Sequence, residues 1–222
     1  MSSNRLALSL ATATLLVSAS GFAAPVGYTV DKDHSKIGFS VRHMMISNVT
    51  GNFKDFDGSF TFDAAKDTLT DGKFEAKTAS INTDNVKRDE HLKSADFFDA
   101  AKYPTITFTD TKLKKVSKDK YKWSGTLTMH GVSKPVTFDL EKLGTAKDPW
   151  GNMRAGFAAT TKVKRGEWGL NWNKALETGG LVVSDDVTLD LSVEAVEAKA
   201  PGAAAPAAAA ATPAAASATK KK

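Results

Sequence analysis

The sequence predicts an all-β fold of about eight antiparallel strands with one short helical insertion, arranged as a sandwich or a closed barrel. Three observations lead to this prediction. Apolar and polar residues alternate along most of residues 36–194, turn signals separate most of the alternating segments, and residues 86–104 interrupt the pattern. Alternation with a period of two is typical of half-buried strands. About eight strands suffice to close a barrel that either fills with side chains or encloses one small ligand.

Apolar residues on one face define each predicted strand. In residues 36–45 that face carries Ile37, Phe39, Val41, His43 and Met45. After the interruption the same alternation returns in residues 105–109, 121–130, 136–140, 154–163 and 187–194. The last segment is the most regular, with Val187, Leu189, Leu191 and Val193 opposite polar neighbours.

Glycine, aspartate and proline mark the expected changes of direction. Gly51 and Gly58 are expected to allow a sharp bend or bulge between them. Asp71-Gly72 is a turn signal that should precede a strand over residues 73–81, and residues 131–135 are read as a turn.

Residues 86–104 have the features of a short helix followed by a loop. Asp84 is expected to cap a helix that runs through Ser94, and Pro104 should stop the segment before the next strand. Phe97 and Phe98 are expected to plug the end of the barrel from inside.

Both ends of the chain differ in composition from the body. Residues 1–23 combine Arg5, an apolar run and small residues near Ala23, which is typical of a secretory signal peptide cleaved near Ala23. The alternative, a membrane anchor, would need a longer apolar run. Residues 200–222 are mostly Ala, Pro, Thr and Ser before Lys220–Lys222, which predicts a disordered tail. Its lysines either contact the envelope or a membrane transiently, or are simply solvated.

The domain between these ends, residues 24–199, is expected to lie in the periplasm or to be secreted. The net charge of +5 belongs to the ends, because removing Arg5 and the three terminal lysines leaves 26 − 25 = +1. We therefore do not expect nucleic-acid binding. The absence of cysteine excludes disulfides, thiol catalysis and thiolate metal sites.

Neither a metal site nor an enzyme is predicted from the polar residues. The four histidines, His34, His43, His91 and His130, are not spaced as metal ligands. No nucleophile elbow, phosphate-binding loop or dinucleotide motif is present.

Several short motifs follow one another in an order that resembles the YceI-like family. They are Asp33-His34-Ser35, Gly51-Asn52-Phe53 with Phe56-Asp57-Gly58, residues 88–94 with Asp96-Phe97-Phe98, Tyr103-Pro104, residues 125–128, residues 131–136, and Asp148-Pro149-Trp150-Gly151 with residues 154–157. The resemblance covers about residues 28–197. It implies an exported, lipocalin-like eight-stranded barrel that encloses a polyisoprenoid tail, such as that of a prenyl quinone or prenyl phosphate. Glu167-Trp168-Gly169 stands where the family commonly has Phe-Gly, and the larger ring could narrow the cavity.

The expected function is therefore non-enzymatic binding, shielding or transport of an isoprenoid lipid or quinone in the cell envelope, with no other cofactor. Apolar, aromatic walls are what such a pocket needs. The predicted wall comprises Phe39, Val41, His43, Phe60, Phe62, Phe97, Phe98, Phe108, Trp123, Phe138 and Phe157. Two alternatives are an enzyme acting on such a lipid and a stress-related structural protein with a filled core.

Two sets of residues at the barrel rim can each be interpreted in two ways. Arg88, His91 and Lys93 are expected to meet a charged head group, unless they pair with nearby acids as ordinary surface charges. Trp168 and Trp172 are expected to form either a second gate or rim packing.

Overall fold

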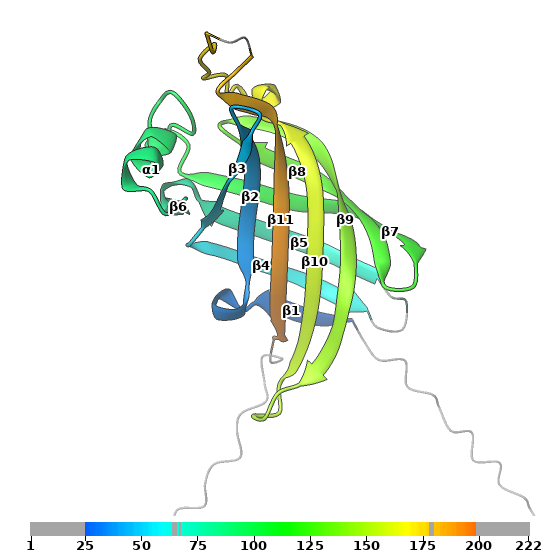
Figure 1. Cartoon of the computed structure of the whole chain (residues 1–222). Coiled ribbons are helices and arrows are strands. Elements are labelled where there is room, and N and C mark those ends of the chain that lie inside the picture. The colour runs from blue at the N-terminus through cyan, green and yellow to red at the C-terminus, as the bar shows by residue number, and fades with distance from the viewer. Residues whose placement is uncertain (1–24, 64–65, 67, 178–179, 199–222) are drawn as a thin grey trace, which may run out of the picture.

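The computed structural model describes residues 25–63, 66, 68–177 and 180–198 (Figure 1). The predicted signal peptide and the predicted C-terminal tail, with Lys220–Lys222, lie outside the described residues. Within those ranges, no helix combines the length and the apolar character needed to cross a membrane.

Eight strands in the described part of the chain close into an antiparallel barrel. Their order around the barrel is β1, β4, β5, β7, β8, β9, β10 and β11, and β11 pairs back with β1. Their bounds are β1 (Val26–Val30), β4 (Phe56–Asp63), β5 (Thr68–Lys77), β7 (Thr105–Ser117), β8 (Lys120–Met129), β9 (Val132–Lys147), β10 (Met153–Lys164) and β11 (Val183–Glu197). The predicted eight-stranded antiparallel barrel is confirmed.

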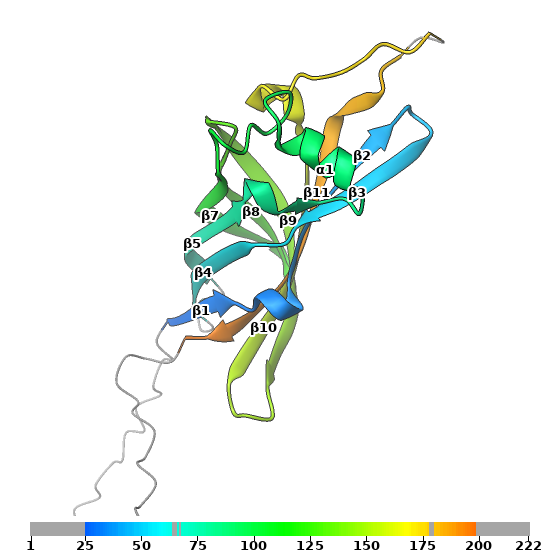
Figure 2. The same cartoon turned by 90° about the vertical axis from the view of Figure 1, so that its left-hand side faces the viewer.

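Three further strands extend the barrel wall beyond one edge of β11. They are β2 (Lys36–His43), β3 (Ser47–Phe53) and β6 (Ile81–Asn82). Strand β11 pairs with β2 over residues 183–192 and with β1 over residues 195–197. One edge of β11 is thus shared by two strands, which are separated by the 3-10 turn η1 (Lys32–His34). Figure 2 shows β2 and β3 projecting past β4 toward the end of the barrel that carries α1.

The interruption in the strand pattern forms the short helix α1 (Val86–Lys93), placed between β6 and β7 after the 3-10 turn η2 (Thr78–Ser80). The helix ends at Ser94, as predicted. The predicted cap is wrong by one residue, because the Asn85 side chain accepts the hydrogen bond from Arg88 N at 3.0 Å. Asp84 instead adopts a left-handed φ of 59° and accepts from Asn82 Nδ2.

A bend lies between Gly51 and Gly58, as predicted, but neither glycine forms it. The chain changes direction at residues 54–55, whereas both glycines lie inside strands, Gly51 in β3 and Gly58 in β4. A Cβ on Gly51 would lie 2.4 Å from the Phe39 ring, and one on Gly58 would lie 2.5 Å from the Phe74 ring. The two glycines therefore make room for aromatic rings against the backbone.

Asp71-Gly72 is a bulge and not a turn. It lies within β5, where Asp71 has a φ of 57° and the pairing with β4 shifts register. The Asp-Gly pair correctly indicates a residue with a left-handed backbone conformation. Bulges and turns both contain such residues, so the pair does not tell them apart. The predicted turn over residues 131–135 is similarly displaced: it is formed by His130-Gly131, and β9 has already begun at Val132.

The tip of the β2–β3 hairpin also departs from simple alternation. Strand β2 ends at His43, and Met44 and Met45 follow in a turn with φ values of 49° and 61°. Met45 is 60% exposed and does not continue the inward face. This hairpin lies at the end of the barrel that also carries α1 and the 3-10 turn η3 (Arg165–Trp168) (Figure 2).

Candidate functional site

A cavity of about 190 Å³ lies inside the barrel. That is more than ten times the roughly 10–15 Å³ that one water molecule needs. Its wall consists of inward-facing residues of the barrel strands and β2, completed by residues of α1 and the loop that follows it. Because strand side chains alternate between the two faces, the apolar stripe of each strand is the part that faces this space. One of these wall residues, Phe60, stacks on Tyr28 with the ring centroids 5.4 Å apart.

Nine of the predicted wall residues line the cavity. They are Phe39, Val41, Phe60, Phe97, Phe98, Phe108, Trp123, Phe138 and Phe157. The other two do not. Phe62 is buried elsewhere in the packed core, with Lys142 Nζ 5.6 Å from the centre of its ring. His43 is half-buried at the last position of β2, where the strand ends before the exposed hairpin tip.

The cavity wall also contains residues that were not among the predicted wall residues. Strand β11 contributes Val187, Leu189, Leu191 and Val193, whose strict alternation was a usable signal. Arg165, at the start of η3, also lines the cavity. No comparable pattern marks Arg165, because an arginine just after a strand usually lies in solvent.

The loop after α1 closes one side of the cavity with two aromatic rings. Phe98 meets Phe53 edge to face at 6.1 Å, and Phe97 is 8% exposed. On its outer side Phe97 packs against His91 and Trp172, each with its ring centroid 5.1 Å away. The segment that includes α1 and the segment that follows η3 therefore meet over the same end of the barrel.

The two tryptophans considered as a second gate have different positions. Trp172 lies at the rim, in the contact with His91 and Phe97. Trp168 is 1% exposed, and its indole N–H donates to the Leu127 carbonyl oxygen at 3.2 Å.

The three basic residues expected at a head group contact their own segment. Arg88 donates from Nε to Thr83 Oγ1 at 2.7 Å and from Nη2 to the Thr83 carbonyl at 2.8 Å. Lys93 pairs with Glu90 at 3.0 Å, and His91 Nε2 lies 2.9 Å from Asp96 Oδ2. None of the three lines the cavity described here. For His91 and Lys93 these contacts agree with the alternative of surface charges paired with nearby acids, whereas Arg88 hydrogen-bonds Thr83.

The sequence and the fold match known proteins along nearly the whole described chain. The YceI-like domain matches residues 28–195. This chain belongs to the YceI-like family. It is 40% identical over 192 residues to a UPF0312 protein of Azotobacter vinelandii, covering 86% of this chain and 95% of that protein. Protein YceI of Escherichia coli O157:H7 is 40% identical over 194 residues, covering 86% and 97%.

Solved structures show the same YceI-like barrel. The YCEI protein of Campylobacter jejuni is 35% identical, with a TM-score of 0.63, and the match covers 86% of this chain and all of that one. A domain from Saccharophagus degradans, described as polyisoprenoid binding and implicated in plant cell wall breakdown, shares the fold at 18% identity with a TM-score of 0.57. That match covers 78% of this chain and 99% of that one.

Trp168 does not narrow this cavity. Its ring is absent from the cavity wall and packs in the core, where its N–H has a backbone acceptor. The expectation that the larger ring would reduce the space for a ligand is therefore wrong.

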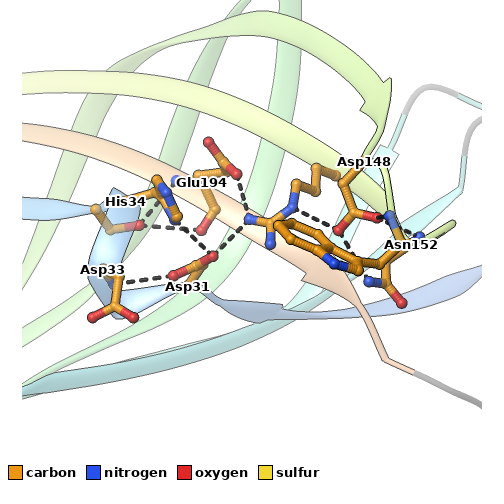
Figure 3. A network of polar contacts seen from close by, with 9 residues as sticks. Asp31, Asp33, His34, Asp148, Asn152 and Glu194 are labelled. Carbon is orange, nitrogen blue, oxygen red and sulfur yellow. Dashed lines mark hydrogen bonds and ion pairs between the residues drawn. The ribbon is translucent and has the colours of Figure 1, made fainter.

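A polar cluster lies at the end of the YceI-like barrel opposite α1 (Figures 1 and 3). Arg154 on β10 donates from Nη1 to Asp31 at 2.6 Å and to Glu194, and from Nε to Asp148 at 3.1 Å. The Arg154 hydrogen bond is the main cause that lowers the pKa of Asp31 to about 2. Hydrogen bonds from Asn152 and then Arg154 lower the pKa of Asp148 to about 2.

Three members of this cluster have a spacing that a metal ion could use. The ligand atoms of Asp31, His34 and Glu194 all lie within 4.8 Å of one another. The guanidinium of Arg154 already contacts both carboxylates. A second cation there would have to displace it, so the arrangement fits an ion-pair network that joins the start of η1 to β10 and β11.

Proposed function

We propose that this protein binds the hydrocarbon chain of an isoprenoid-type lipid inside its barrel, and shields or carries that lipid in the cell envelope. The observation that carries the proposal is the hollow interior, whose wall is almost entirely aliphatic and aromatic. Burying each methylene group of a ligand there contributes about 0.8 kcal/mol of favourable free energy, so binding of an apolar chain is favourable. The description of the Saccharophagus domain as polyisoprenoid binding agrees with this ligand class.

The cavity also bears on the two alternatives. A structural protein with a filled core would have no reason to keep a space of about 190 Å³, because interiors normally pack to high density. An enzyme would need a nucleophile or an acid–base pair at the bound lipid. Histidine and serine are absent from the wall that the described residues form, and its two carboxylates, Asp57 and Glu75, pair with Lys32 and Lys77. Binding without turnover is therefore the function favoured here.

The place of action belongs to the same proposal. The composition of residues 1–23 is typical of an export signal. In an aqueous envelope compartment, a lipid with a long apolar chain needs a protein to cover it. We infer that the barrel supplies that cover in the periplasm or outside the cell.

The direct test is to purify the protein from its native export route, extract it with organic solvent and identify the lipids by mass spectrometry. The delipidated protein is then titrated with geranylgeraniol, following the total tryptophan fluorescence, to which Trp123 on the cavity wall contributes. We expect about one equivalent of an isoprenoid lipid in the extract and saturable uptake in the titration. Recovery of no lipid, together with no uptake, would refute the proposal.

A further inference from the structure

Arg165 places a buried positive charge on the wall of the apolar cavity. Its side chain follows Val163 in the inward-facing series of β10, one residue past the end of that strand. The residue is 6% exposed. A cation in such a position normally has a paired acid, since burying an unpaired charge costs much free energy.

The described protein contacts of Arg165 are to neutral groups. Nε donates to the Ser184 carbonyl at 3.0 Å, and Nη1 donates to the Leu170 carbonyl. Among the described residues, Nη2 has no hydrogen-bond acceptor and the guanidinium has no ion pair. Burial lowers the pKa of Arg165 from its usual value, yet a guanidinium still keeps its charge in proteins.

The other charged residues on the wall are already neutralised. Glu75 pairs with Lys77, and Asp57 pairs with Lys32 at 2.9 Å. Asp185 attracts the Arg165 guanidinium and partly offsets the effect of burial on its pKa, but the two form no ion pair, and Asp185 Oδ1 accepts from Gly166 N at 3.0 Å. Among the charged residues of the described wall, Arg165 is thus the one that forms no ion pair at contact distance.

We propose that Arg165 binds the anionic head group, a phosphate, of the lipid whose chain fills the cavity. Two backbone carbonyls hold the guanidinium in place, and its remaining N–H groups are available to phosphate oxygens, which pair well with this fork. The head group then lies at the η3 end of the barrel, and the chain extends toward Phe60 and Phe157. This inference rests on the proposed function and narrows its ligand class.

The experiment compares two ligands that share one chain, geranylgeranyl phosphate and geranylgeraniol, on the delipidated full-length protein. We expect the wild-type protein to bind the phosphate at least about tenfold more tightly than the alcohol, the effect of a charged hydrogen bond. Arg165→Gln should abolish this preference while leaving the affinity for the alcohol within about threefold. Lys164→Gln is the matched control, because Lys164 is the exposed neighbour that pairs with Asp186, and it should keep the preference.

The outcomes separate this inference from the proposed function. Binding of neither ligand refutes the proposed function itself. Equal binding of both ligands by the wild-type protein, or a preference that survives Arg165→Gln, overturns the role of Arg165 alone. If Arg165→Gln does not fold, the Nε–H resonance of Arg165 in the wild-type protein provides the test. The chemical shift of this resonance should change when geranylgeranyl phosphate binds and stay the same when geranylgeraniol binds. The reverse result counts against the proposal.

Discussion

At the level of single residues, Arg154 links the acid stability of the fold to the polar cluster at the end of the barrel opposite α1. Asp31 and Asp148 both have a pKa of about 2 in the folded protein, below the usual value of 3.8. A lowered carboxyl pKa contributes stability above the unfolded-state value, and this is lost as the pH falls through the folded-state value. This network should make the protein less stable in acid. We expect the urea concentration at the unfolding midpoint to decrease as the pH is lowered from about 4 to about 2.

Replacing Arg154 with methionine tests this assignment. The variant should be less stable than the wild type at pH 7 and should lose less stability between pH 4 and pH 2. Lys162→Met is the control, because Lys162 is an exposed residue of the same strand. An equal acid response in the wild type and in Arg154→Met would show that other carboxyl groups determine it.

The turn at the tip of the β2–β3 hairpin contains backbone strain. Met44 and Met45 both have left-handed φ values, a conformation that costs an L-residue about 1–2 kcal/mol. Met45→Gly should therefore raise the free energy of unfolding by roughly 0.5 kcal/mol, after allowing for the greater freedom of glycine in the unfolded chain. Ile46→Gly, at the next exposed position, should give no such gain. Urea unfolding at neutral pH measures both.

At the level of elements, helix α1 depends on its cap. The Asn85 side chain satisfies the Arg88 N–H, so Asn85→Ala should lower the free energy of unfolding by about 1 kcal/mol. Asp84→Asn should be close to neutral, because asparagine tolerates the left-handed φ at that position. If the two substitutions had equal effects, the cap would not be at Asn85.

The contact between the α1 segment and the segment after η3 decides whether this end of the barrel opens. Trp172 packs against His91 and Phe97 and joins the two segments. If lipid passes between them, Trp172→Ala should increase the rate of lipid release several-fold, measured by transfer to acceptor vesicles. Trp150→Ala is the control, since Trp150 is 81% exposed in the β9–β10 turn at the opposite end. An unchanged release rate would indicate a fixed plug and another path.

The sequence predicts a strand well where one face of the strand is buried and the other is exposed to solvent. Residues 121–129 and 187–193 alternate strictly, and the structure has strands there. The errors fall where local chemistry fits two outcomes. Asp71-Gly72 favours a left-handed residue but does not distinguish a bulge from a turn, and either Asp84 or Asn85 could cap the helix. The burial of Arg165 depends on how η3 returns to β11, which no local pattern encodes.

At the level of the whole molecule, the hollow interior makes a prediction that a filled core does not. Leu191 on β11 faces the cavity, and Ser192 beside it faces outward and is exposed. Leu191→Trp should occupy the cavity and reduce lipid uptake while the thermal unfolding temperature changes little. In a filled core the same substitution would overpack and cost about 1–3 kcal/mol.

Ser192→Trp adds the same ring to the other face and is the matched control for that experiment. It should leave lipid uptake unchanged, because its ring lies outside the barrel. Loss of uptake in both variants would mean that the strand, and not the cavity, was disturbed.

Strands β1 and β11 bring the two limits of the described chain together, as the 2.8 Å hydrogen bond from Ala198 N to the Gly27 carbonyl shows. This junction lies at the end of the barrel away from α1 and η3 (Figures 1 and 2). A protein immobilised on a sensor chip by a handle placed next to either limit would turn its ligand-facing end toward the sample. The same geometry suits a fused reporter, which would sit on the opposite side from the ligand.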